Sequence, residues 1–231
     1  MKQLLTLLRW DTIHLYRNQL ISISVILGLI YFGLFYLIRD FANADDFLVL
    51  LIYNDPVITG YVFAAVLLLF ERNQNTLSAL SVSPLRLSAY LWSKALVLSF
   101  LAWIIAFMMT LAARGGDVHW FHFSFGVLSS TLLFVFAGFA ITAGCTSLNS
   151  LIARSVPIFV VFALPFLGLF EIVNTTIWYL IPTYPGILLI KTAFSTAEVP
   201  IVVYSYTYGT LGVAIFYLWA ISRVSNKISL S

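Results

Sequence analysis

Hydrophobic residues occur along this chain in six long runs that are separated by short polar stretches. The runs cover residues 20–38, 47–70, 95–113, 124–144, 155–173 and 201–222. Each is close to the roughly 20 residues that an α-helix needs to cross a bilayer, and none shows the strict alternation of a transmembrane β-strand. The pattern predicts an all-α membrane protein, with six transmembrane helices in a single transmembrane domain over residues 1–231.

The second run is interrupted by Asn54, Asp55 and Pro56. Proline cannot donate the backbone hydrogen bond that a helix interior requires, so it commonly kinks or ends a helix. We therefore expect the outer part of this run to be a kinked segment or a separate short helix.

The segment before the first run, residues 1–18, has the pattern of an amphipathic helix. At 100° per residue, its apolar side chains share an arc of roughly 120°, with basic and polar side chains opposite. The apolar arc, interrupted by Thr12, holds Met1, Leu4, Leu5, Leu8, Leu15 and Tyr16. We expect this helix to lie flat at the membrane interface, either as a simple anchor or as an elbow that transmits motion from a cytosolic partner.

Composition agrees with a membrane protein, because only 9% of the residues are charged, against roughly 25% in soluble domains. The single cysteine, Cys145, excludes a disulfide within the chain. Asp117, His119 and His122 are close in sequence and of types that bind metals, but a fourth ligand is not evident. We expect neither a metal site nor a cofactor.

The basic residues fall mainly on one side of the predicted membrane. With a cytosolic N-terminus, nine of the twelve lysines and arginines lie inside, and Arg39, Arg114 and Lys191 lie outside. Seven of the nine acidic residues, including Asp55 and Glu171, fall outside or at the outer edge. Because cytoplasmic loops favour Lys and Arg, we predict a multi-pass protein with both termini in the cytosol, in contact with membrane lipid and not with nucleic acid.

The longest polar segment on the predicted cytosolic side is the loop over residues 71–94. Asn75 or Thr76 can cap a short helix by accepting backbone N–H bonds, and Pro84 ends it, because the residue before proline avoids helical geometry. Leu77 and Leu80 give this helix an apolar side. The helix suits a groove on another protein, although a simple solvated loop is the alternative.

The residues of this loop resemble those of ABC-2 type transporter permeases. The stretch reads Glu-Arg-x-x-x-Thr-Leu-x-x-Leu-x-Val-Ser-Pro-Leu and is followed by a tyrosine and a lysine. The matching residues are Glu71, Arg72, Thr76, Leu77, Leu80, Ser83, Pro84, Tyr90 and Lys94. Asn75 replaces the family's usual glycine, and Ser78 replaces its usual acidic residue. Among such permeases, the six-span layout is most similar to the drug-export type, including fluoroquinolone export permease subunits.

The resemblance implies a subunit of a bacterial ABC exporter in the inner membrane, not an enzyme itself. The loop would hold a short cytosolic coupling helix that docks into a separate ATPase, which binds the ATP; the sequence itself has no Gly-x-x-x-x-Gly-Lys-Ser/Thr phosphate loop. The permease would pair with an identical or paralogous copy through its first and fifth spans and export a hydrophobic or amphipathic substrate, such as a drug. A haem-exporter B-like permease and a non-transport scaffold are the alternatives.

Two features near the predicted outer surface have two interpretations each. Glu171, at the outer end of the fifth run, is either a gate for the exported molecule or a side chain that reaches the headgroups, where a charge costs less than at mid-bilayer. The aromatic and proline-containing segment over 174–200 is either an interfacial belt or, as the resemblance implies, a set of short re-entrant helices.

Overall fold

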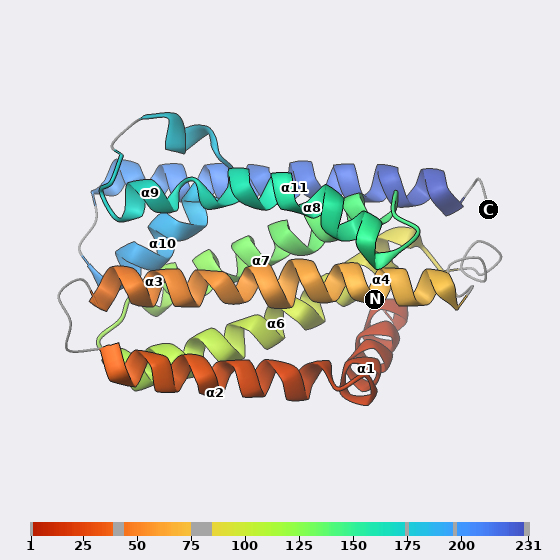
Figure 1. Cartoon of the computed structure of the whole chain (residues 1–231), viewed down its shortest axis with the longest axis horizontal. Helices are drawn as coiled ribbons and strands as arrows, with labels where there is room; N and C mark the ends of the chain where they lie inside the picture. The colour runs from red at the N-terminus through yellow and green to blue at the C-terminus, as the bar shows by residue number, and fades with distance from the viewer. Residues whose placement is uncertain (1, 39–43, 75–84, 174–175, 196–197, 229–231) are drawn as a thin grey trace.

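The computed structural model describes residues 2–38, 44–74, 85–173, 176–195 and 198–228, and this part of the chain consists of helices and their connecting turns (Figure 1). Five helical stretches are long and apolar enough to cross a membrane. They run over Asp45–Arg72, Leu87–Arg114, Trp120–Thr142, Leu148–Leu169 and Val199–Asn226. A bent pair of helices at the N-terminus makes a sixth if it is counted as one span. The predicted all-α membrane fold is thereby confirmed, and the described residues contain five to six candidate transmembrane helices.

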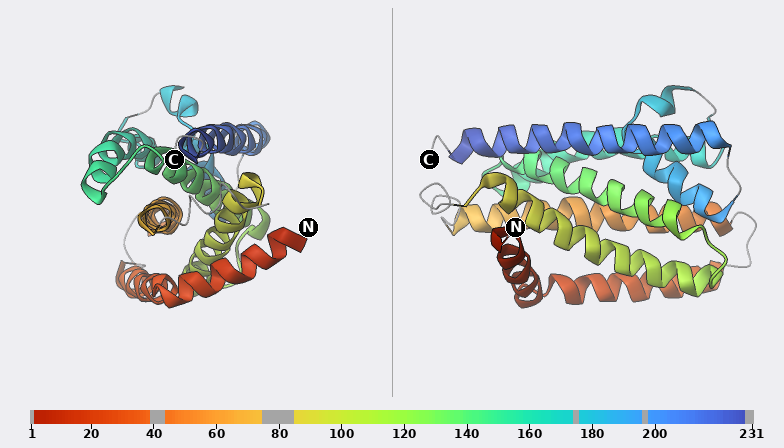
Figure 2. Two further views of the ribbon diagram at one scale, coloured as in Figure 1. Left: turned by 90° about the vertical axis from the view of Figure 1, so that its right-hand side faces the viewer. Right: turned by 180° about the vertical axis from the view of Figure 1, so that it is seen from behind.

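The first two helices form a corner. α1 (Lys2–Arg17) and α2 (Leu20–Ile38) are bent by 68°, and Gln19 adopts the left-handed conformation between them, with a φ of 59°. α1 crosses the end of the bundle at which the last helix also finishes (Figures 1 and 2). We call this the termini end and the other the opposite end. α1 packs there against α6 (Leu87–Arg114) and buries Leu15.

The second span is continuous, in contrast to the expected kink or separate short helix. It consists of α3 (Ala44–Asp55), the π-helix η1 (Pro56–Val62) and α4 (Phe63–Asn73). In an α-helix the ring of Pro56 would clash with the preceding turn, and the wider pairing of a π-helix gives it room. The proline therefore changes the type of helix and does not end it.

α7 (Trp120–Thr142) lies at the centre of the bundle and packs against η1 and α6. The backbones of α7 and η1 approach closely: a Cβ atom on Gly138 would lie 2.8 Å from the carbonyl oxygen of Tyr61. Small residues permit such contacts between membrane helices. This packing holds the π-helical segment against the most buried helix of the bundle.

The fifth span begins earlier than the predicted 155–173. α8 (Leu148–Ala163) starts at a capping box, in which the Ser147 hydroxyl accepts from the Ser150 amide while the Ser150 hydroxyl accepts from the Ser147 amide. Residues 149–154, expected as a cytosolic turn, are therefore helical. After a turn, α9 (Phe166–Leu169) completes the span.

Two short helices precede the last span, α11 (Val199–Ile228). The 3-10 helix η2 (Thr176–Leu180) is followed by α10 (Tyr184–Phe194), which packs against α7, α11 and α3. The hydroxyl of Tyr53 donates to the carbonyl of Thr183 at 3.0 Å, just before α10 begins. α10 is therefore packed inside the bundle near the opposite end (Figure 1). Its relation to the membrane, re-entrant or interfacial, stays a prediction.

Candidate functional site

A buried charged cluster joins three helices at the termini end. The ammonium of Lys94, from the second turn of α6, lies 2.7 Å from Glu71 Oε1 and 2.9 Å from Asp11 Oδ1. Glu71 comes from the last turn of α4, and Asp11 from α1. Lys94 is 4% exposed and Glu71 is 8% exposed. Because so little water reaches these groups, they depend on one another for solvation.

The remaining carboxylate oxygens of the cluster are also satisfied. The Tyr90 hydroxyl donates to Glu71 Oε2, and the Ser93 hydroxyl donates to Asp11 Oδ2 at 2.5 Å. Tyr90, Ser93 and Lys94 are three and four residues apart, a spacing that places them on one face of a helix. The face of α6 thus offers three donors to two carboxylates on two other helices.

A second set of contacts stabilises the end of α7. The guanidinium of Arg72 donates to the carbonyl of Cys145, and that of Arg154 donates to the carbonyl of Gly144 at 3.0 Å. The last carbonyls of a helix lack donors within the helix and carry partial negative charge. The two arginines, from α4 and α8, satisfy carbonyls just beyond this helix end and connect three spans.

The structure brings together three of the residues that sequence similarity singled out, namely Glu71, Tyr90 and Lys94. Arg72, the next residue after Glu71, donates instead to the carbonyl of Cys145. The other candidates, and with them the predicted coupling helix, lie outside the described residues: Thr76, Leu77, Leu80, Ser83 and Pro84. The predicted loop over 71–94 is shorter than expected, because residues 71–73 belong to α4 and residues 87–94 belong to α6.

Sequence reasoning missed Asp11 and Ser93, which complete this cluster. One signal was present, because Asp11 borders the apolar arc of the amphipathic segment at 100° per residue. An acidic residue at that border suggests a partner on the surface against which the helix packs. Nothing in the sequence identified α6 as that surface.

A profile of the fluoroquinolones export permease protein family matches residues 2–228 of this chain. The chain belongs to that family. Two curated proteins from strains of Mycobacterium tuberculosis, both named fluoroquinolones export permease protein, are each 28% identical over 142 residues. The aligned region covers 61% of this chain and 60% of each relative. The match confirms the predicted resemblance to drug-export permeases. The family and the five to six apolar helices together indicate a multi-pass membrane protein.

The permease contains a second buried acid, Asp55, which was predicted at the outer edge and lies well inside the span. The second span runs from Asp45 to Arg72, and Asp55 lies ten residues from its first end and 17 from its second. At 1.5 Å per residue these separations are about 15 Å and 25 Å. Asp55 is 1% exposed. Its Oδ1 accepts from the Thr59 hydroxyl at 3.1 Å, whereas Oδ2 has no hydrogen-bond partner among the described residues.

Glu171, the predicted outer gate of the permease, follows α9 on an exposed turn and has a φ of 56°. Its amide donates to the carbonyl of Gly168 at 3.2 Å, which closes the turn. The Glu171 side chain is exposed, and its role as an outer gate stays a prediction.

Among the described residues of the permease, no group of three or more histidine, cysteine, aspartate or glutamate side chains could hold a metal ion. The His122 Nδ1 atom and the Tyr206 hydroxyl are 2.7 Å apart, which links α7 to α11. The contact of His122 with Tyr206 is thus one between two transmembrane helices.

Proposed function

We propose that the protein is the membrane-spanning subunit of a bacterial ABC exporter, driven by ATP that a separate ATPase subunit binds and hydrolyses. It would export a hydrophobic or amphipathic substrate, including drugs of the kind named for its relatives. The contact with the ATPase would be the coupling helix expected between α4 and α6, at residues 75–84.

The observation that carries this proposal is the buried cluster around Lys94. It joins the last turn of α4 and the second turn of α6, which flank residues 75–84 in the chain. The same lysine also holds Asp11 of α1. A displacement of the segment between the two spans would therefore move both spans and α1 together, as a rigid coupling between distant sites requires.

The proposed orientation places the termini end in the cytosol of the inner membrane. It is supported by the bias of lysine and arginine toward that end. At the opposite end, both basic residues that the structure describes are paired with acids. Arg114 forms an ion pair with Asp45, and Lys191 lies 3.0 Å from Asp46.

The proposed active form is a dimer with an identical or paralogous permease. α2 and α8 lie on the same side of the bundle, on either side of α3 and α4 (Figure 2). Both helices have exposed apolar side chains: Ile26, Leu29, Ile30 and Leu37 on α2, and Ile152, Val156, Val160 and Val161 on α8. These surfaces suit contact with a second transmembrane subunit as well as with lipid.

The ATPase partner is tested by purifying the tagged full-length chain from its native cells and measuring copurifying ATPase activity. The double variant Leu77→Asp, Leu80→Asp should lose this activity by about tenfold or more, because charged groups replace apolar anchors of the contact. Leu148→Asp is the matched control: it is an exposed leucine in the first turn of α8, outside the proposed contact, and should retain the activity.

Full retention of ATPase activity by the double variant would show that residues 75–84 are not the docking site. Absence of any copurifying ATPase from the wild type would favour the scaffold alternative. Accumulation of a fluoroquinolone in cells with and without the intact permease tests the substrate, since export should lower the intracellular level.

A further inference from the structure

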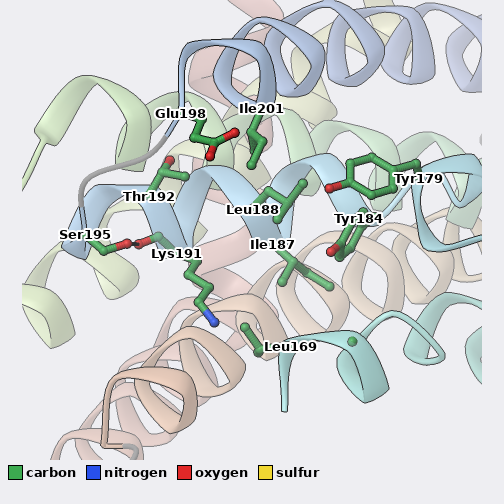
Figure 3. A pocket seen from close by; sticks show the side chains of 11 residues that line it. Leu169, Tyr179, Tyr184, Ile187, Leu188, Lys191, Thr192, Ser195, Glu198 and Ile201 are labelled. Carbon is green, nitrogen blue, oxygen red and sulfur yellow. Dashed lines mark hydrogen bonds between the residues drawn. The ribbon is translucent and has the colours of Figure 1, made fainter. Parts of the chain in front are cut away.

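A groove lies at the opposite end of the bundle, along one face of α10 (Figure 3). α9 borders it on one side, and the start of α11 borders it on the other. Its volume is about 330 Å³, at the lower end of the roughly 300–1,000 Å³ of small-molecule pockets. The groove is far from the Lys94 cluster and shares no residue with it.

The groove has an apolar floor and an aromatic end. The floor comes from Leu169, Ile187 and Leu188. Tyr179 and Tyr184 form the end, with ring centroids 5.1 Å apart at 86°, and both hydroxyls point into the groove (Figure 3). Such a lining suits a ligand that has an apolar or aromatic body.

The charges of the groove are unbalanced. The ammonium of Lys191 is neutralised by Asp46, 3.0 Å away. The hydroxyls of Thr192 and Ser195 donate to backbone carbonyls of α10. In the described part of the chain, Glu198 forms no ion pair. The charge left without a partner along this groove is therefore negative.

We propose that this groove binds an organic cation with an apolar or aromatic body. The cationic group lies beside the Glu198 carboxylate, and the body lies against the floor and the rings of Tyr179 and Tyr184. The hydroxyl oxygens of Tyr179 and Tyr184, which point into the groove, carry partial negative charge and can accept hydrogen bonds. The aromatic end therefore adds to the attraction that Glu198 exerts on a cation. This proposal depends on the proposed function in one respect: the orientation given there places the groove, at the opposite end of the bundle, on the outer side of the membrane.

Two sources could supply this chemistry, namely an exported molecule on its way out and the amine headgroup of an outer-leaflet lipid. The probe is tetraphenylphosphonium, and its control is tetraphenylborate, which has the same shape and the opposite charge. Binding of both is measured to the full-length protein in dodecyl maltoside, a detergent without a charged group.

The wild type should bind the cation more tightly than the anion, and Glu198→Gln should weaken cation binding by about fivefold, as expected for one partly exposed ionic contact. Asp117→Asn, which removes an exposed acid at the same end of the bundle but outside the groove, should change nothing. Lys191→Met should not weaken cation binding, because it releases Asp46. Glu198 is exposed and directly precedes α11. Its substitution should therefore lower the thermal unfolding temperature only slightly, through the lost interaction of a carboxylate with a helix N-terminus.

Equal affinity of the wild type and Glu198→Gln for tetraphenylphosphonium, or equal binding of the two probes by the wild type, would overturn the proposal. Displacement of the cation by short-chain phosphatidylethanolamine, but not by short-chain phosphatidylglycerol, supports it with a lipid amine as the source. Displacement by neither lipid supports it with an exported cation as the source, whereas equal displacement by both contradicts it. Because binding is measured without an ATPase, this outcome is independent of the coupling experiment.

Discussion

Glu71 and Asp55 are buried acids of the same continuous span, and their surroundings differ sharply. Glu71 has a donor for each oxygen, from Lys94 and from Tyr90. Asp55 has one neutral donor, Thr59, and its second oxygen has no partner among the described residues. Glu71 also lies one residue from the end of the span, whereas Asp55 lies well inside it.

The difference shows how the stability of a buried acid in this protein depends on a cationic partner. A buried ion pair remains stable only while each member keeps its partners, and removal of one partner leaves a charge that the interior does not solvate. An acid without a cation is costly in a membrane interior, and such residues commonly mark functional positions. Loss of Lys94 should therefore destabilise the Glu71 site strongly, whereas Asp55 forms no ion pair within the described part of the chain.

The largest effect is expected for Lys94→Met, which leaves Glu71 and Asp11 without their shared cation. We expect a loss of about 3–5 kcal/mol in the free energy of unfolding, measured by thermal or denaturant unfolding in detergent. Arg114→Met is the control, because its ion pair with Asp45 is largely exposed and should contribute about 1 kcal/mol or less. Equal losses in both variants would mean that burial does not distinguish the two pairs.

A smaller effect is expected for Tyr90→Phe, which removes only the donor to Glu71 Oε2. The unsatisfied oxygen should cost about 1–3 kcal/mol in unfolding free energy. In the Lys94→Met background the same substitution should have a different effect, because residues in one network are not additive. Additive losses in a double-mutant cycle would show that Tyr90 and Lys94 act independently on Glu71.

The smallest effect is expected for Asp55→Asn, which preserves shape and an acceptor for Thr59. No cation loses its partner, so the unfolding free energy should change by about 1 kcal/mol or less, or rise, since burial of a charged group costs more than burial of a neutral one. A loss as large as that of Lys94→Met would reveal a cationic partner for Asp55 and remove the contrast between the two acids.

The sequence predicted the helical class and the approximate position of each span, but not where the helices end. Hydropathy reports the thickness of the apolar layer, whereas α6 begins at Leu87 and α11 continues to Ile228, because backbone hydrogen bonding does not stop at the membrane boundary. Pro56 was correctly recognised as a disturbance. Its outcome, a π-helix packed on α7, depends on a neighbouring helix that the local sequence does not contain.

The candidate site was predictable on α4 and α6 and not on α1. Glu71, Tyr90 and Lys94 were singled out by similarity, and the structure brings them into contact. Asp11 is about 80 residues from its partners in the chain, so only the 68° corner and the packing of α1 on α6 reveal its role. Asp55 was misplaced because charge counting assigns acids to a side of the membrane and contains no measure of burial.

The contact between Arg72 and the carbonyl of Cys145 places a native thiol where α4 meets the end of α7, so alkylation of this thiol can report on that contact. Cys145 is the single cysteine of the chain and is fully buried, with its thiol directed to the carbonyl of Ile141 at 3.3 Å. Buried thiols are inert toward alkylating reagents. Labelling of the unmodified protein would therefore record the moment at which α4 and the end of α7 separate, without an engineered probe.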